Sequence, residues 1–214
     1  MRPRVVVIGV VAATLVGLGA WLLGGFRSAE RVRAVRAGGE VDQTLFRTRL
    51  LEARAGWVQE SKYVQRRHVL LLVASVTNLS RQTQLLRGPA TDHNFPHSLF
   101  PQWPRGGKVA VFSQAKAYQG NISTWQLQPR LPARVVLEYD LPAGMAAPAR
   151  LTVGLAGFAY TASGILDPRG YWEFQATGFR AVRQRDPVSG RMRTTTQIVP
   201  RIVARVTLPV TEAA

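Results

Sequence analysis

The sequence predicts an all-β fold, an antiparallel β-sandwich preceded by one N-terminal transmembrane helix. Beyond residue 39, short runs rich in Val, Leu, Thr and aromatic residues are separated by clusters of Gly, Pro, Asn and Ser. The same region has no long amphipathic helix pattern. Seven to nine short strands in about 170 residues fit a sandwich better than a barrel or an α/β fold.

An uncharged apolar run near the N-terminus predicts the helix. The run extends from Val5 to Phe26 and, at about 1.5 Å per residue, would rise roughly 33 Å as a helix. This is enough to cross a hydrocarbon core of about 30 Å. Trp21 and Phe26 lie near its far end, where aromatic rings favour the membrane interface. We therefore expect residues 1–27 to form a membrane anchor with a short cytoplasmic tail.

A cleaved signal peptide is the alternative to an anchor. The basic start suits either, but the run exceeds the usual length of about 7–15 residues, and no small-x-small cleavage site follows it closely. Arginines lie on both sides of the run, and the four that follow it would by count keep the C-terminal side in the cytoplasm. A short tail before a long apolar run is instead the usual layout of an exporting signal anchor. We expect a single-pass protein of the cell membrane whose C-terminal domain lies outside the cytoplasm.

The segment after the anchor divides into a charged stalk, residues 28–39, and a sandwich over residues 40–212. The stalk ends in Gly38-Gly39, a natural boundary. Several runs of the sandwich region alternate apolar and polar residues, as half-buried strands do, and the run HVLLLVASVTN is apolar on both phases, as a central strand is. The residues predicted to face the core are Phe46, Thr48, Leu50, Val135, Leu137, Tyr139, Leu141, Leu151, Val153, Leu155, Ile202, Ala204, Val206 and Leu208.

Two segments depart from the strand pattern. Residues 85–107 have the composition of a Pro/Gly-rich loop that is too long for a mere connector. Residues 179–197 indicate a polar, arginine-rich hairpin that turns at 186–190. The candidate contact surface taken from these two segments is Arg180, Arg183, Arg185, Arg191, Arg193, Phe95, Phe100 and Trp103. For the three aromatic residues, the alternative is that they pack back onto the sandwich.

The chain resembles a group of uncharacterised bacterial extracytoplasmic domains found on lipoproteins and single-pass anchors, notably in actinobacteria. The resemblance rests on a strand that ends in Thr77-Asn78 before a polar turn, and on a Leu-x-Pro turn, Leu127 to Pro129, that leads into a strand ending in Pro142. It covers roughly residues 38–174 and implies an immunoglobulin-like β-sandwich outside the cytoplasm. It implies no activity and no catalytic residue.

The composition restricts the partners and the chemistry. The formal net charge is +16, all but three of the basic residues are Arg, and the region after residue 37 remains strongly positive. This favours an anionic partner, although a solvated basic surface, or the codon usage of a GC-rich genome, would also explain it. Cysteine is absent, which excludes disulfides, thiolate metal sites and a cysteine nucleophile.

The remaining constellations do not form a catalytic site. Asp92, His93 and His97 lie close in sequence, but no helix would place the imidazoles on one face. Glu138 and Asp140 share one face of a predicted strand, where acidic residues opposite arginines are usually solvated. No phosphate-binding glycine loop and no nucleophile elbow occurs. We expect no catalytic residue, no cofactor and no metal.

The predicted function is that of a membrane-anchored, non-enzymatic extracytoplasmic interaction domain of the bacterial cell envelope. Its partner would be a protein or an anionic polymer or lipid of the envelope. The alternative is an accessory subunit of a multi-protein membrane complex. An enzyme and a nucleic-acid-binding protein are weaker readings, the latter because the arginine-rich hairpin holds Phe179 as its only aromatic residue.

Overall fold

The computed structural model describes residues 32–59, 65–86, 94–104, 108–162, 170–185 and 192–212. Residues Arg33–Ala214 group into one compact unit, which is built of strands with one short 3-10 helix within the described ranges. These ranges hold no helix with the length and apolarity needed to cross a membrane. The predicted anchor, residues 1–27, lies outside them.

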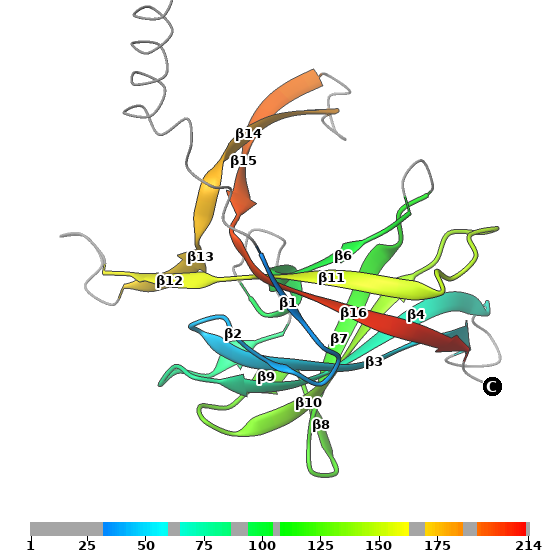
Figure 1. Cartoon of the computed structure of the whole chain (residues 1–214), viewed down its shortest axis with the longest axis horizontal. Coiled ribbons are helices and arrows are strands. Elements are labelled where there is room, and N and C mark those ends of the chain that lie inside the picture. The colour runs from blue at the N-terminus through cyan, green and yellow to red at the C-terminus, as the bar shows by residue number, and fades with distance from the viewer. Residues whose placement is uncertain are drawn as a thin grey trace, which may run out of the picture. The chain divides into compact units, whose positions relative to one another are not determined.

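Two layers of strands make up the sandwich (Figure 1). The larger layer has the order β3-β4-β10-β7-β8, with β2 paired to β3. Its strands are β2 (Glu40–Asp42), β3 (Phe46–Val58), β4 (Arg67–Asn78), β7 (Val111–Gln119), β8 (Ile122–Thr124) and β10 (Pro132–Asp140). The smaller layer has the order β6-β11-β16, with β1 paired to β16. Its strands are β1 (Arg33–Val35), β6 (Leu99–Gln102), β11 (Arg150–Ala156) and β16 (Ile202–Glu212).

The last strand connects the two layers. β16 pairs antiparallel with β11 from Ile202 to Pro209, and its final residues Val210–Glu212 pair in parallel with β3. Eight of the ten strands therefore form one hydrogen-bonded path that passes from one layer to the other, and β1 and β2 pair with strands of this path from outside it. All other pairings are antiparallel except that of β1 with β16, within the described part of the chain.

Apolar side chains from both layers share one core. Buried and less buried residues alternate along much of β3, β10 and β16, because successive side chains point to opposite faces of a strand, and the alternation on β3 shifts at the bulge after Leu50. The predicted core faces are confirmed: thirteen of the fourteen predicted residues are buried, and Ile202 is half-buried. β4 is a central strand, as predicted, with β3 on one side and β10 on the other.

A buried polar group joins the layers at one end. The Gln43 side chain is fully buried; its Nε2 donates to the Ala156 carbonyl oxygen at 2.8 Å and to Ser98 Oγ at 3.1 Å. Its Oε1 accepts from Thr48 Oγ1 at 2.7 Å. Because Thr48 belongs to the larger layer and Ala156 to the smaller one, this side chain fixes the distance between them.

The folded unit starts earlier than the sequence predicts. β1 lies inside the predicted stalk and pairs with residues 204–206 of β16, which places the start at Arg33 rather than at residue 40. Gly38 has a positive φ of 73° and lies in the turn between β1 and β2, where its N–H donates to the Leu50 carbonyl oxygen at 2.7 Å. The two glycines thus form a turn within the domain, not its boundary.

The segment 85–107 is not a simple loop. It contains the end of β5 (Gln84–Leu85), the 3-10 helix η1 (Pro96–Ser98) and β6, which is an edge strand of the smaller layer. β5 pairs with β9 (Gln126–Leu127). The prediction of one long loop is therefore wrong for residues 96–102.

A long insertion separates β11 from β16. It holds two hairpins, β12 (Phe158–Thr161) with β13 (Tyr171–Phe174), and β14 (Ala176–Arg185) with β15 (Met192–Pro200). The second pair confirms the predicted arginine-rich hairpin, although its turn, 186–191, lies outside the described residues. β14 and β15 pair only with each other within the described ranges, so they form a two-stranded ribbon (Figure 1).

Candidate functional site

Three connections come together at one end of the sandwich, which we call the loop end. They are the β4–β6 connection (79–98), the β7–β10 connection (120–131) and the β11–β16 connection (157–201). The strand registers place them there: Thr77 pairs with Pro132 in the larger layer, and Ala156 pairs with Ile202 in the smaller one. Loops gathered at one end of a rigid sandwich are a common place for binding residues.

Asn78 fixes two of these connections against each other. Its side chain is fully buried, and its Oδ1 accepts from the backbone N–H of Ser80 at 3.0 Å and from Ser80 Oγ at 2.8 Å. Its Nδ2 donates to the carbonyl oxygens of Gln82 at 2.7 Å and Leu127 at 2.9 Å. The Arg130 N–H donates to the Asn78 carbonyl oxygen at 2.8 Å. The turn that carries Arg81 and the turn that carries Arg130 are thereby held side by side.

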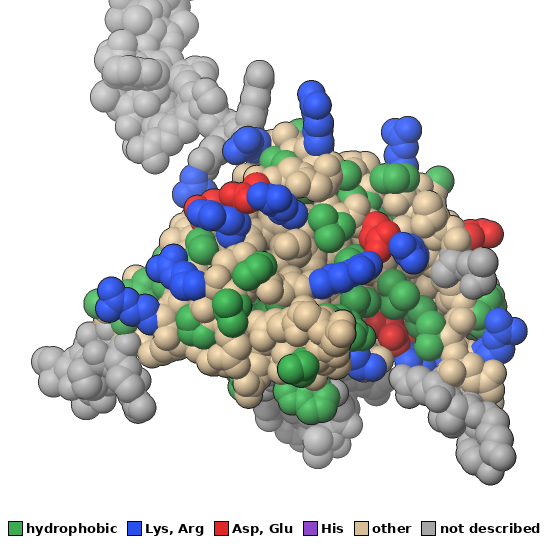
Figure 2. Space-filling view, turned by 90° about the horizontal axis from the view of Figure 1, so that it is seen from below, with side chains coloured by type: hydrophobic (Ala, Val, Ile, Leu, Met, Phe, Trp, Pro, Cys, Tyr) green, Lys and Arg blue, Asp and Glu red, His purple; other side chains and the backbone are tan. Residues whose placement is uncertain are grey.

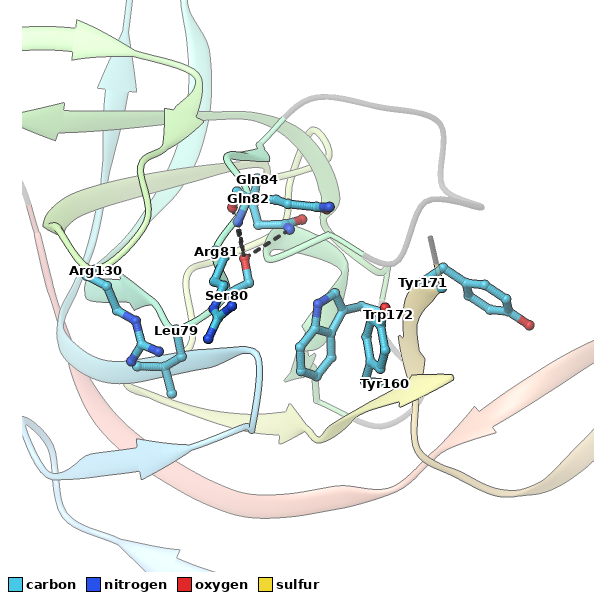
Figure 3. A pocket seen from close by; sticks show the side chains of 10 residues that line it. Leu79, Ser80, Arg81, Gln82, Gln84, Arg130, Tyr160, Tyr171 and Trp172 are labelled. Carbon is cyan, nitrogen blue, oxygen red and sulfur yellow. Dashed lines mark hydrogen bonds between the residues drawn. The ribbon is translucent and has the colours of Figure 1, made fainter. Parts of the chain in front are cut away.

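A cleft of about 740 Å³ opens beside these turns (Figure 3). One side is formed by the turn after β4 and by Arg130, and the other by the β12–β13 hairpin. The lining residues are Leu79, Ser80, Arg81, Gln82, Gln84, Arg130, Tyr160, Gly170, Tyr171 and Trp172. Its size falls within the range of about 300–1,000 Å³ that is usual for ligand sites.

The charge in the cleft has one sign. Arg81 and Arg130 are exposed, and neither forms an ion pair with any residue that the structure describes. Among the described residues, the lining includes no Asp and no Glu. Arg130 has a positive φ of 63°, a left-handed backbone conformation stabilised by its hydrogen bond to Asn78. Two guanidinium groups without a neighbouring carboxylate attract an anion.

Two aromatic rings form the opposite wall. Tyr160 and Trp172 are register partners in the β12–β13 hairpin, and their ring centroids lie 5.3 Å apart at an interplanar angle of 63°. Trp172 is partly buried and packs against the core, whereas Tyr160 is 53% exposed. Figure 3 shows both rings across the cleft from Arg81. The wall is therefore rigid at Trp172 and open to solvent at Tyr160.

Two of the three aromatic residues predicted as contact residues, Phe95 and Trp103, pack onto the sandwich. Phe95 has no exposed surface, and its ring packs edge-on against that of Phe46, with the ring centroids 5.4 Å apart. Phe100 and Trp103 are half-buried, and Trp103 packs against the core with its ring 6.0 Å from that of Tyr139. The prediction is wrong for Phe95, because burying a large apolar ring stabilises the fold and leaves nothing for a partner to contact.

The predicted hairpin arginines are only partly described. Arg180 and Arg183 lie on β14 and are exposed, and their odd spacing places them on opposite faces of the ribbon. Arg185 lies at the end of β14 and Arg193 on β15, whereas Arg191 lies outside the described residues. The structure thus does not gather Arg180 and Arg183 on one face.

The acidic pair on β10 is held by an arginine. Arg67 Nη2 bonds to Glu138 Oε1 at 2.7 Å, and Arg67 Nη1 bonds to Asp140 Oδ1. Gln114 Nε2 donates to the other Glu138 oxygen at 3.2 Å. The hydrogen bond to Glu138 raises the pKa of Arg67. Two carboxylates that share one guanidinium form a structural ion-pair group.

No metal site emerges from the described residues. They include no group of three or more His, Cys, Asp or Glu residues that could hold an ion. His97 is half-buried against Phe112, with the ring centroids 6.0 Å apart. Asp92 and His93, the other members of the sequence cluster, lie outside the described residues.

Basic side chains also predominate on the face of the molecule seen in Figure 2. In the exposed ion pairs, two arginines share each acidic residue: Arg47 and Arg49 share Glu40, and Arg54 and Arg134 share Glu52. Such exposed pairs stabilise the fold little. The positive potential is therefore not confined to the cleft, and the cleft is distinguished by its aromatic wall.

Sequence reasoning missed the four residues that define the cleft: Arg81, Arg130, Tyr160 and Trp172. A signal for the first two was available, since each arginine lies in a turn flanked by the Thr-Asn and Leu-x-Pro patterns. Their proximity was not visible, because it depends on the pairing of β4 with β10.

Comparison with known proteins identifies no family and no function for this chain. No family model matches the chain, and no curated protein matches it. Among solved structures, the chain is similar to an uncharacterised β-sandwich protein from Clostridium difficile 630, with 11% sequence identity and a TM-score of 0.37. The similarity covers 60% of this chain and 91% of that one.

Proposed function

We propose that this chain is a membrane-anchored, non-enzymatic binding domain of the bacterial cell envelope. In this proposal residues 1–27 hold the protein in the cell membrane, and an immunoglobulin-like sandwich outside the cytoplasm binds an anionic partner at its loop end. The apolar run from Val5 to Phe26 supports the anchor.

The strand order supports the immunoglobulin-like assignment. Without the three-residue strands β1, β2 and β8, seven strands remain in the two layers. Lettered A to G in chain order, they read A-B-E-D in the larger layer and C-F-G in the smaller one. This is the order of constant-type immunoglobulin domains. The loop end then corresponds to the end that carries the B–C, D–E and F–G connections.

The observation that carries the binding role is a pair of guanidinium groups in the cleft that form no ion pair with any described residue. Asn78 holds the turns of Arg81 and Arg130 together through five hydrogen bonds, and the described lining of the cleft has no acidic side chain. Two exposed cations that line one cleft raise the local concentration of anions there. A structural role would pair each guanidinium with a carboxylate, as Arg67 is paired.

A binding role also suits the chemistry of the cleft better than catalysis does. The lining residues that the structure describes include no His, Asp or Glu that could act as a general base. The hydroxyl of Ser80 is already bonded to Asn78 and Gln82, so it is not poised as a nucleophile.

The test measures the binding of anionic polymers to the full chain in detergent. The probes are polyaspartate, polyphosphate and polygalacturonate, and the variants are Arg81→Gln, Arg130→Gln and their combination. At least one probe should bind, with an affinity about tenfold lower in each single variant and lower still at high salt. Arg150→Gln, at the opposite end of β11, is the matched control and should bind as the original does. If no probe distinguishes the cleft variants from this control, the proposed role is wrong.

The β14–β15 ribbon favours the second candidate function, an accessory subunit of a membrane complex. Phe179 and Ile198 are register partners on one face of the ribbon and are 74% and 39% exposed. An isolated two-stranded ribbon is marginally stable in water, so a partner that covers this pair would stabilise it.

A substitution on the ribbon separates the two functions. Phe179→Ser combined with Ile198→Ser should convert a large native assembly into a smaller particle if the chain is a subunit. Val111→Ser, which also removes an exposed side chain from a strand, is the control. An unchanged size in gentle detergent extracts at native expression would eliminate the subunit function.

A further inference from the structure

We propose that the loop-end cleft binds an acidic saccharide, with a sugar ring against Trp172 and Tyr160 and a carboxylate or phosphate group at Arg81 and Arg130. This inference rests on the proposed function and adds to it the chemical class of the ligand. Three kinds of side chain in the cleft carry it: the aromatic wall, two amides and the two arginines.

The aromatic wall suits a sugar ring. The C–H bonds on one side of a pyranose carry partial positive charge, and they pack favourably on the electron-rich face of an aromatic ring. Trp172 offers such a face from a fixed position, because it is partly buried against the core and contacts Tyr160. The angle of 63° between the two rings gives no pair of parallel rings that would clamp a planar base. The geometry thus favours a sugar over a nucleobase.

The amide side chains suit hydroxyl groups. Gln82 and Gln84 line the cleft, and an amide offers both a donor and an acceptor, as hydroxyl-rich ligands require. Gln84 Nε2 donates to Ser80 Oγ at 3.4 Å, and this hydrogen bond holds the Gln84 side chain against the turn that follows β4. The Gln82 N–H donates to the same hydroxyl at 3.2 Å, so the turn that presents both amides is held in one conformation.

The arginines supply the preference for an acidic sugar. A guanidinium group is planar and binds a carboxylate or phosphate through two parallel hydrogen bonds. Arg81 lies across the cleft from the aromatic rings, and Arg130 lies farther along the same side as Arg81 (Figure 3). A saccharide that spans the cleft would therefore meet the rings with one face and the arginines with its acidic substituent.

The other anionic partners use fewer of these features. An acidic peptide such as polyaspartate would engage the arginines and leave the aromatic wall without a matching surface. An acyl chain would need an apolar channel, whereas Leu79 is the one aliphatic side chain among the described lining residues. The combination of aromatic, amide and guanidinium groups fits a saccharide best.

The experiment compares defined probes on the full chain in detergent. The probes are trigalacturonate, the neutral sugar maltotriose, hexa-aspartate, and adenosine monophosphate as a nucleotide, followed by an array of uronate-containing and phosphate-containing oligosaccharides. The cleft variants are Arg81→Gln, Arg130→Gln, Trp172→Leu and Tyr160→Leu. Tyr118→Leu, which removes an exposed ring from β7, is the aromatic control, and Arg150→Gln is the charge control. Tyr160→Leu keeps the test valid if Trp172→Leu fails to fold, because Tyr160 is the more exposed of the two rings.

An acidic saccharide should bind at least tenfold more tightly than maltotriose and hexa-aspartate. Arginine and aromatic variants should each weaken it about tenfold, and the two controls should leave it unchanged. If hexa-aspartate or the nucleotide binds as tightly as the acidic saccharide, and Tyr160→Leu does not change that binding, the saccharide inference is overturned while the anion-binding role stands. If the arginine variants change the binding of no anion, both proposals are overturned. The inference is also overturned if the protein binds no acidic saccharide on the array.

Discussion

Asn78 links the fold to the candidate site. Its amide satisfies two carbonyl oxygens and accepts two hydrogen bonds, and its backbone accepts from Arg130. A fully buried amide that uses all its bonding capacity defines a single arrangement of the turns around it. The position of Arg81 relative to Arg130 therefore depends on this one side chain.

We expect Asn78→Ala to lower the free energy of unfolding by about 2–4 kcal/mol, because it removes the buried amide donor to the carbonyl oxygens of Leu127 and Gln82 and the acceptor for Ser80. The same change should weaken binding of the anionic probes, since the two arginine-bearing turns lose their connection. Denaturant unfolding and probe titration measure the two effects. Asn121→Ala, at an exposed asparagine in the β7–β8 turn, should change neither, and equal effects at both positions would contradict this role.

Tyr139 gives a prediction on alkaline stability. Burial between the layers raises the pKa of its phenol above the ordinary value of about 10. The folded state thus favours the neutral phenol, and this contribution is complete below about pH 10 and is lost as the pH rises toward the folded-state pKa.

Between about pH 10 and 12, the original chain should therefore lose stability faster than Tyr139→Phe does, because the unfolded chain ionises this phenol and the folded chain does not. Unfolding curves recorded across this range measure the difference in slope. Tyr118→Phe, at an exposed tyrosine, should show the slope of the original chain. Parallel curves for all three proteins would show that Tyr139 does not contribute.

At the scale of the elements, the β12–β13 hairpin positions the aromatic wall. Gly170 has a positive φ of 60°, and a Cβ atom there would lie 2.3 Å from Tyr160 Oη and 2.9 Å from the Thr161 carbonyl oxygen. Only glycine leaves room for the tyrosine in its present position.

Gly170→Ala should displace Tyr160 and weaken the binding of an acidic saccharide several-fold, and it should cost about 1–2 kcal/mol of stability through its backbone conformation. Gly144→Ala is a close control, since Gly144 also has a positive φ, 76°, but its Cβ would contact nothing within 4 Å. Calorimetry and titration separate the effects: both variants should lose stability, and only Gly170→Ala should lose affinity. If Gly170→Ala and Gly144→Ala bind the saccharide with equal affinity, the position of the Tyr160 ring does not matter for binding.

The strands were predictable where one face is buried and the other is exposed. Phe46, Thr48 and Leu50 alternate with exposed arginines, and this period of two was visible in the sequence. β6 was not predicted, because its Pro101 removes a backbone donor; an edge strand tolerates this loss. β1 was assigned to the stalk, because Arg33 and Ala34 are exposed and Val35 is half-buried, so they leave no alternating pattern.

The cleft was less predictable than the strands. Its two arginines lie in turns far apart in the sequence, and the register of β4 with β10 brings the turns together. The prediction of Phe95 as a contact residue failed for a different reason. Phe95 lies in a segment with the composition of a surface loop, but the hydrophobic effect places its ring in the core. Composition indicates a loop; it does not tell which of its rings are buried.

At the scale of the whole molecule, the net charge of the chain and the charge of the cleft both favour an anionic partner. The chain carries a formal net charge of +16, the described surface shows arginines that exceed their acidic partners, and the described lining of the loop-end cleft has two cations and no acid. A basic domain outside the cytoplasm would encounter anionic envelope polymers, whereas the same domain inside would encounter nucleic acid. If the chain is anchored as proposed, the identity of the partner therefore depends on the side of the membrane on which the sandwich lies.

Labelling of a single introduced cysteine tests this most directly. The chain has no cysteine of its own, and Thr194 is exposed on β15 of the ribbon, so Thr194→Cys provides a unique thiol on the domain. The account predicts that a membrane-impermeant maleimide labels this thiol in intact cells, while Pro3→Cys, in the predicted cytoplasmic tail, is labelled only after lysis. Labelling of Thr194→Cys only after lysis would contradict the account.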